Sequence, residues 1–345
     1  MKEFFAPKLA LLMVLIVFGL PVNAQTDCVA KLDSAKMLFN SGQIEEIPSL
    51  LEPCLRIGFA KQDKIQAYLL LIQVYLFDSN REKAQQIMSE FLHSFPDYDI
   101  QPSDPTEFIE LYKTFRVKPI WGIGIAGSIN ASQVLVKQHY STDNLNKLNS
   151  KYSPDILGFD GGLHICKFFK SNIWISADFQ YSITNLKRKD ILGVKNEALN
   201  YSESTGWFTA PVYLSYSIGR GRIAPYIYAG GEAGYLFVDK SYIVRQNLVD
   251  NSIPNIEQKS TDNRLNRKSF NAWALGGVGL LYKTMGGYFN LSIGYRYSLM
   301  PFVKKENRYA NINSLYYYQY IDDDFRINRF SCSIGYTKVF YKIKK

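Results

Sequence analysis

The sequence predicts a chain of two parts: an N-terminal all-α part made of helix hairpins, and a C-terminal all-β part that forms an eight-stranded antiparallel transmembrane barrel. Three changes near Pro119 support this division. Residues 25–119 contain 2 Gly and no Trp, whereas residues 120–345 contain 20 Gly and all 4 Trp. The net charge changes from −4 to +12 across the same point. The spacing of apolar residues changes from a period of 3.6, typical of helices, to a period of 2, typical of strands.

Residues 1–24 have the pattern of a secretory signal peptide. Lys2 and Lys8 supply a basic start, and residues 9–20 form an apolar run. This run is shorter than the roughly 20 residues that a spanning helix needs. We therefore expect cleavage after Ala24 and export of the remaining chain.

The helical part extends over residues 25–119. Its periodicity predicts four helices joined by short connections, which make antiparallel hairpins. These helices are expected over residues 27–40, 43–57, 62–77 and 80–94. A linker helix should follow, with Asp104 as its N-cap and Pro105 at its first position, ending near Arg116.

The second hairpin resembles a tetratricopeptide repeat. Its packing positions are occupied by Tyr68, Leu71, Tyr75, Ala84 and Pro96. This resemblance implies a surface that binds a partner protein, and it implies no catalysis. An unrelated small helical bundle is the alternative.

Cys28 and Cys54 lie on the two arms of the first predicted hairpin, 26 residues apart. Export to an oxidising compartment permits a bond between them. We expect Cys28 and Cys54 to form a disulfide and Cys166 and Cys332 to stay free.

Eight long strands with strict alternation of apolar and polar residues are predicted after Pro119. Strands of soluble sandwiches average about 5–6 residues, whereas these are about twice as long. Apolar-out, polar-in alternation over such lengths is typical of transmembrane barrels. The strands are expected over residues 120–130, 156–167, 173–184, 207–218, 224–237, 270–284, 288–299 and 325–340.

The intervals between these strands alternate between long and short, at 25, 5, 22, 5, 32, 3 and 25 residues. Barrels of the bacterial outer membrane have long outer loops and short periplasmic turns. The rhythm therefore predicts an integral outer-membrane protein. Both ends of the barrel would lie on the short-turn side, which places the helical part in the periplasm.

The four tryptophans stand near the ends of predicted strands. Trp121 and Trp174 begin strands on the periplasmic side, and Trp207 and Trp273 begin strands on the outer side. Aromatic residues at both membrane interfaces form girdles. We expect these four residues to form such girdles.

A segment of the strand part resembles a known family. Residues 206–216, with Pro211 inside an aromatic strand, are followed by Ala224-Pro225-Tyr226 and a glycine-rich strand. This pattern is similar to the PorT-type outer-membrane barrels of Bacteroidota. The resemblance covers residues 120–345 and implies an eight-stranded barrel with a role in type IX protein secretion or other envelope assembly. The added helical part departs from the plain family pattern.

Several charged residues fall at positions that face the barrel interior. One interpretation is a catalytic or proton-relay cluster. The other is a network of ion pairs and hydrogen bonds that fills the lumen, because charges away from water must be paired. The residues concerned are Asp160, His164, Asp178, Glu232, Arg296 and Arg329.

The predicted outer loops are basic, as in residues 187–189, 264–268 and 304–305. Lipopolysaccharide and other outer-membrane lipids are the expected counter-charge, and nucleic acid is excluded outside the cell. Residues 322–324, three consecutive Asp, could hold a divalent cation or form a solvated loop end.

These observations predict a non-enzymatic barrel that anchors a periplasmic protein-interaction module within an envelope assembly. The sequence contains no motif for a cofactor or a metal. A small passive channel is the alternative, although side chains fill the interior of an eight-stranded barrel. An outer-membrane enzyme is a third possibility, for which His139 is the His in the predicted outer loops.

Overall fold

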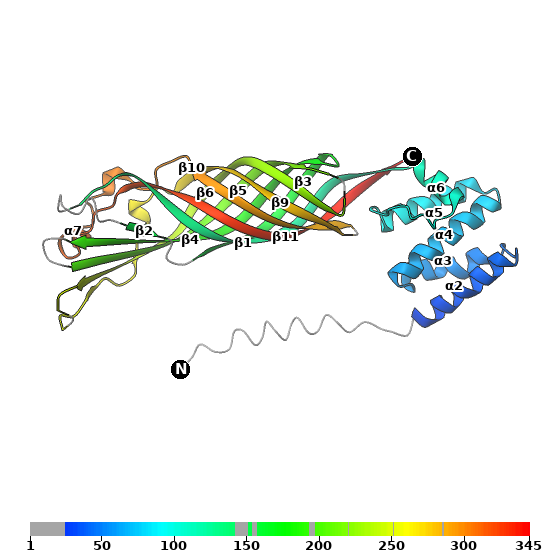
Figure 1. Ribbon diagram of the computed structural model, residues 1–345, viewed down its shortest axis with the longest axis horizontal. Coiled ribbons are helices and arrows are strands. Elements are labelled where there is room, and N and C mark those ends of the chain that lie inside the picture. Colours follow the sequence, from blue (N-terminus) through cyan, green and yellow to red (C-terminus); the bar gives the residue numbers. More distant parts are fainter. Residues whose placement is uncertain are drawn as a thin grey trace. The chain divides into compact units, whose positions relative to one another are not determined.

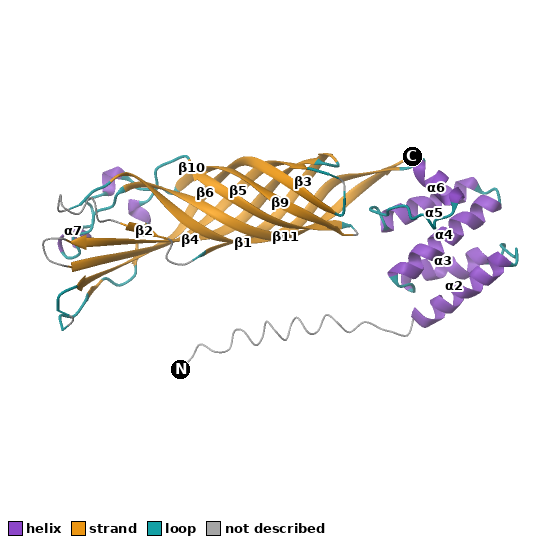
Figure 2. Ribbon diagram, in the orientation of Figure 1, coloured by secondary structure: helices purple, strands orange, loops and turns teal. Residues whose placement is uncertain are grey.

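The computed structural model describes residues 25–141, 151–153, 157–192, 197–219, 221–250, 252–284 and 286–345. The expected signal peptide lies outside these residues. The chain forms two compact units, one of residues up to Val117 with Ile343–Lys345 and one of residues Lys118–Lys342. The first unit is helical and the second is made chiefly of strands (Figures 1 and 2).

Short connections join the helices of the first unit. The helices are α2 (Gln25–Asn40), α3 (Ile47–Ile57), α4 (Lys61–Phe77), α5 (Arg81–Ser94) and α6 (Thr106–Lys113). Helix α3 begins four residues later than expected, because Pro48 lacks an N–H and suits the first turn of a helix. Within the described residues, no helix is long and apolar enough to cross a membrane.

Helix α4 is the centre of this unit and contacts α2, α3, α5 and α6. Its buried side chains, such as Tyr68, Leu71 and Ile72, lie around most of the helix. The all-round apolar sequence predicts this burial. Phe91 of α5 extends the core, with its ring 5.5 Å from that of Phe108 in α6.

The linker helix differs from the expectation at both ends. Pro105, not Asp104, is the N-cap of α6. The Asp104 carboxylate instead accepts hydrogen bonds from the Tyr98 hydroxyl at 2.9 Å and the Gln101 N–H at 2.7 Å, so it is committed to the preceding turn. The helix ends at Lys113, because strand β1 begins at Arg116.

The expected disulfide is confirmed. Cys28 of α2 and Cys54 of α3 are bonded, with their Cα atoms 5.7 Å apart. A Cβ atom at Gly58 would overlap the Cys28 sulfur, so the glycine after α3 leaves room for the bridge. Cys166 and Cys332 are free.

In the second unit the described residues form one sheet of eleven strands, rather than the eight expected. The strands are β1 (Arg116–Gln138), β2 (Lys151–Ser153), β3 (Gly158–Lys170), β4 (Ile173–Leu192), β5 (Glu197–Ser217), β6 (Ile223–Asn247), β7 (Ile256–Glu257), β8 (Thr261–Asp262), β9 (Phe270–Thr284), β10 (Gly287–Ser298) and β11 (Asp324–Lys344). The difference arises because the short strands β2, β7 and β8 pair with β4 and β6.

The sheet closes into a barrel. Its long strands follow one another in the order β1, β3, β4, β5, β6, β9, β10 and β11, and β11 is hydrogen-bonded to β1. Pairing between β4 and β5 completes the circuit. Closure removes exposed sheet edges, which a lipid environment requires.

Strands β4 and β5 extend well beyond the predicted ends. The interval 185–206 was expected to be a loop, but β4 and β5 pair as far as Leu192 and Glu197. The alternation continues there with buried polar residues, including Arg188 and Glu203, so an apolar pattern does not reveal it. The long–short rhythm therefore fails at this connection.

The two ends of the barrel differ in their connections. We call the end with residues 139–157, 193–196, 248–269 and 299–323 the long-loop end. The opposite end, with residues 171–172, 218–222 and 285–286, is the short-turn end. Strand β1 starts at the short-turn end and β11 finishes there (Figure 1).

The outer wall of the barrel is apolar. Ile175 and Ile293 point outward and are 36% and 48% exposed, whereas the neighbouring Ser176 and Ser292 point inward and are 1% and 6% exposed. The alternation of the sequence predicts these directions. A continuous exposed apolar surface of this kind suits contact with lipid.

Reduction of the disulfide should weaken the helical unit. Loss of the Cys28–Cys54 bond in a C28S/C54S variant should cost about 3 kcal/mol, because the bond restricts the unfolded chain. The helical circular-dichroism signal at increasing urea concentration measures this change. An unchanged midpoint would contradict the prediction.

Arginine on the outer wall should destabilise the barrel. Ile175→Arg and Ile293→Arg should each cost about 2–4 kcal/mol in lipid, because the charge would face hydrocarbon. Unfolding in lipid vesicles, followed by heat-modifiable gel migration, measures the loss.

Ile175→Leu and Ile293→Leu are the matched controls, because they keep the wall apolar. Equal losses for the Leu and Arg variants would show that these positions do not face lipid.

Candidate functional site

The interior of the barrel collects polar side chains from five strands. Each inward charge singled out in the sequence is largely buried there. Asp160 and His164 come from β3, Asp178 from β4, Glu232 from β6, Arg296 from β10 and Arg329 from β11. The structure divides these residues into two groups.

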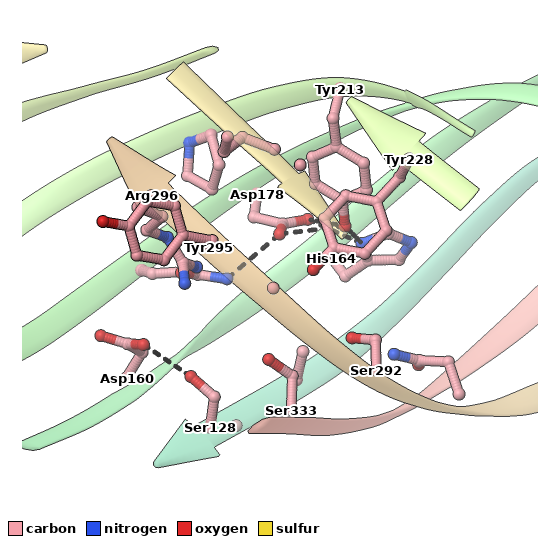
Figure 3. Close-up of a pocket in the computed structure, with 18 of the residues that line it drawn as sticks. Ser128, Asp160, His164, Asp178, Tyr213, Tyr228, Ser292, Tyr295, Arg296 and Ser333 are labelled. Atoms are coloured by element: carbon pink, nitrogen blue, oxygen red, sulfur yellow. Dashed lines mark hydrogen bonds and ion pairs between the residues drawn. The ribbon is translucent and has the colours of Figure 1, made fainter. Parts of the chain in front are cut away.

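The first group centres on Asp178. His164 lies opposite Asp178 in the β3–β4 register, and its Nδ1 is 2.6 Å from Asp178 Oδ1 (Figure 3). The hydroxyl of Tyr213 donates to Asp178 Oδ2 at 3.2 Å, and Gln180 Nε2 donates to the same atom at 3.1 Å. Sequence analysis did not single out Tyr213, although its inward position in β5 is the signal that could have found it.

The second group pairs two arginines with two carboxylates. Arg296 and Arg329 lie directly opposite each other on β10 and β11, an arrangement that repels unless an anion separates the two charges. The Glu232 carboxylate accepts a hydrogen bond from Arg296 Nε at 2.6 Å and another from Arg329 Nη2. Arg329 Nη1 also lies 3.6 Å from Asp160 Oδ1. The charges of the group therefore balance.

Hydrogen bonds satisfy the remaining oxygens of Asp160. Ser128 donates at 2.6 Å, Asn130 donates at 2.9 Å, and Ser182 also donates (Figure 3). Buried charges are stable only when they are paired and hydrogen-bonded in this way.

Between the two groups lies a small cavity. Its volume is about 50 Å³, and its lining includes His164, Asp178, Tyr228 and Arg296. Such a volume holds a few water molecules, at 10–15 Å³ each by the measure used for buried water sites. Glycines adjoin the large rings: a Cβ atom at Gly294 would overlap the Tyr228 hydroxyl. Described side chains thus fill this level of the barrel.

A further buried cluster lies near the long-loop end, around Arg267. Its side chain is fully buried and donates hydrogen bonds to Glu203 of β5 at 2.6 Å and to Asp322 at 2.8 and 2.9 Å. Its Nη2 also donates to the Tyr201 hydroxyl at 2.9 Å. Sequence analysis missed this cluster, because Arg267 and Asp322 lie in predicted loops.

The three consecutive Asp residues do not form a solvated loop end. Asp322 pairs with Arg267, Asp323 with Arg188 at 3.2 Å, and Asp324 with Arg308. Burial raises the pKa of the Asp322 carboxyl, but the guanidinium of Arg267 outweighs burial, so that this pKa lies below its ordinary value. The two arginines beside Asp322 and Asp323 take the place of a cation.

His139 also belongs to this buried arrangement. Its Nδ1 lies 3.2 Å from Asp323 Oδ2, and the Tyr152 hydroxyl donates to the same oxygen at 2.8 Å. Among the described residues, no group of three or more His, Cys, Asp or Glu side chains could hold a metal ion.

Aromatic side chains pack beneath the arginine cluster. Phe302 and Phe325 are fully buried, and their ring centroids are 5.7 Å apart. Phe302 also lies 5.8 Å from the ring of Trp207. The connection 299–323 therefore folds into the mouth of the barrel at its two ends.

The expected tryptophan girdles are wrong for three of the four residues. Trp174, Trp207 and Trp273 are each 3% exposed, whereas Trp121 is 45% exposed. The three buried residues occupy inward positions in their strands, so they pack inside. Trp207 meets Trp273 edge-on at 5.3 Å, and the Arg329 guanidinium lies 4.8 Å from the Trp273 ring.

Removal of the buried Arg267 charge should destabilise the mouth strongly. Arg267→Met leaves Glu203 and Asp322 buried without their cation, which should cost about 3–5 kcal/mol. Urea unfolding of the full chain in detergent micelles measures this loss.

Arg264→Gln is the matched control, because Arg264 is an exposed arginine on the same connection. The control should change stability little, since exposed ion pairs contribute little. Similar losses in both variants would contradict a special role for the buried charge.

The sequence and structure can now be compared with known proteins. No curated protein matches the sequence. Among solved structures, the attachment invasion locus protein Ail of Yersinia pestis is 12% identical, with a TM-score of 0.28 over 63% of this chain and 97% of Ail. Neisserial surface protein A is 10% identical, with a TM-score of 0.29 over 64% of this chain and 97% of its own. The outer membrane protease OmpT from Escherichia coli is 10% identical, with a TM-score of 0.27 over 66% of this chain and 96% of its own.

A family model provides the assignment. The model described as outer membrane protein beta-barrel domain matches residues 116–304, which is more than half of the chain. This match indicates a location in an outer membrane. The chain belongs to the outer membrane beta-barrel domain family.

Proposed function

We propose that the barrel is a non-enzymatic anchor in the outer membrane and that the helical unit binds partner proteins in the periplasm. The closed interior of the barrel carries this proposal. Paired charges fill the lumen around Glu232, and a second cluster around Arg267 fills the mouth. The cavity between the lumen groups, about 50 Å³, is too small for a substrate.

The same packing disfavours the alternative of a passive channel. A conducting pore needs a continuous aqueous path, whereas aromatic side chains such as Phe302, Phe325 and Trp207 pack beneath the mouth. His164 and Asp178 could exchange a proton, but their position inside the wall keeps a macromolecule or lipid out of reach. A structural role for these charges is therefore favoured over catalysis.

The direction of the strands supports a periplasmic helical unit. Strand β1 begins at the short-turn end and β11 finishes there. Outer-membrane barrels direct their short turns toward the periplasm. Residues 25–115 precede β1 in the chain and would accordingly lie on that side.

The helical unit has features of a protein-binding module. Its hairpins α2–α3 and α4–α5 follow one another as in a tetratricopeptide stack, with Tyr68, Leu71 and Ala84 buried at packing positions. A hollow of about 170 Å³ on α3, α4 and α5 is lined by both acidic and basic side chains, including Arg56 and Lys83. Stacked helix hairpins bind peptides or helices of other proteins in such hollows.

We infer from the PorT-like pattern of residues 206–231 that the partners belong to an envelope assembly, with a type IX-like secretion complex as the specific candidate. The opposite charges of the two parts, −4 and +12, fit different surroundings for each part. The added helical unit would recruit a soluble or membrane component to the barrel.

Deletion of residues 27–116 tests this role. The truncated barrel should still insert and remain heat-modifiable but should lose the periplasmic proteins that co-purify with the intact chain from solubilised outer membranes. Quantitative mass spectrometry of the purified complexes measures the loss.

An R56E/K83E variant narrows the test to the hollow on α3–α5, and Lys31→Glu on α2 is the control. The variant should lose partners that the control keeps. Retention of every partner by the truncated barrel would place binding on the barrel and contradict the proposal.

A further inference from the structure

A hollow of about 360 Å³ lies on the outer wall of the barrel, where β6 and the segment before β9 meet the long-loop end. Tyr235, Phe237 and Leu265 contribute apolar side chains to this hollow. Asp262, Arg264 and Lys304 contribute charged ones. We call it the rim hollow. None of these residues takes part in the buried networks of the barrel interior.

The apolar side of the rim hollow continues the lipid-facing wall. Tyr235 and Phe237 occupy outward positions of β6 in the same row as Ile227, and all three are exposed. Leu265 follows on the adjoining connection and is 78% exposed. Large apolar side chains left open in this way need an apolar ligand, and acyl chains supply one at a membrane surface.

The charged side of the hollow retains capacity for an anion. Arg264 donates through Nε and Nη2 to Asp262, at 2.9 and 2.6 Å, and through Nη1 to the Phe237 carbonyl at 3.2 Å. A guanidinium has five N–H groups, so donors on Nη1 and Nη2 remain. The Lys304 ammonium has no hydrogen-bond or ion-pair partner among the described residues. Lys240, which is exposed and lies opposite Asp262 in the β6–β8 pair, adds a further cation.

The hollow is held in shape from within the barrel. Arg267, three residues after Arg264, is fixed by Glu203 and Asp322. The Lys304 N–H donates to the Asn266 carbonyl at 2.9 Å, which joins the two connections that form the hollow. A ligand would meet a preformed site and would lose little free energy to ordering it.

We propose that the rim hollow binds the phosphorylated, acylated sugar of lipopolysaccharide, lipid A. Tyr235 and Phe237 would contact an acyl chain, and Arg264 and Lys304 would contact a phosphate. The boundary between an apolar wall and cationic loops is the depth at which lipid phosphates lie. A free phosphate would leave the exposed aromatic rings uncovered. This inference rests on the proposed orientation, with the long-loop end outside.

Lipid binding by the full-length chain in detergent, followed by native mass spectrometry, tests the site. The probes are bis-phosphorylated lipid A, its dephosphorylated form, phosphatidylglycerol and inorganic phosphate. Wild-type protein should prefer phosphorylated lipid A. The R264Q/K304Q variant should bind it about 30-fold more weakly, since each cation near a membrane surface contributes about fivefold.

K338Q is the matched control, because Lys338 is an exposed cation near the short-turn end, and it should bind lipid A like the wild type. Equal affinity of wild type and R264Q/K304Q would overturn the site. Equal binding of dephosphorylated lipid A or of phosphatidylglycerol, or displacement by inorganic phosphate, would overturn the choice of lipid A.

Labelling of Leu265→Cys on intact cells by a membrane-impermeant maleimide tests the orientation separately. Labelling is expected. Its absence would refute the outward long-loop end, whatever the lipid titration gives, while an unaltered set of co-purifying partners in R264Q/K304Q would leave the function of the helical unit standing.

Discussion

The buried guanidinium of Arg267 organises the long-loop end of the barrel. A buried charge is stable only among partners, and Arg267 finds two carboxylates, Glu203 on a strand and Asp322 on the last long connection. These ion pairs hold the connection 299–323 against the strand ends. The aromatic layer of Phe302 and Phe325 packs beneath them. Outside the wall, the same constraint fixes the position of Arg264 and Lys304, so the interior packing also shapes the rim hollow.

The lumen follows the same principle at another level. Arg296 and Arg329 would repel each other across β10 and β11, and Glu232 between them turns the repulsion into a balanced network. An interior that is closed at both levels has little capacity to conduct or to admit a substrate. The helical unit, with its own core and disulfide, is therefore the part of the chain best suited to bind other proteins.

Much of this architecture could be predicted from the sequence. The period of 2 gives the outward direction of Ile175 and Ile293, and the cysteine spacing gives the Cys28–Cys54 bond. The alternation stopped being informative where inward positions carry charge, as at Arg188 and Glu203, so the extension of β4 and β5 was missed. Trp174 and its two buried counterparts were assigned by residue type, although the strand parity already pointed inward. The pairing of Asp322 with Arg267 depends on contacts across 55 residues, which local patterns do not encode.

The closed barrel is the central claim, and ion conductance tests it most directly. Purified full-length protein, reconstituted into a planar bilayer and checked for heat-modifiable folding, should show no steady open-channel current at moderate voltage. The Arg267→Met variant, in which the mouth is loosened, should at most flicker, because the lumen network around Glu232 remains. A stable, ohmic current through the wild-type protein would contradict the account and would restore the channel as its function.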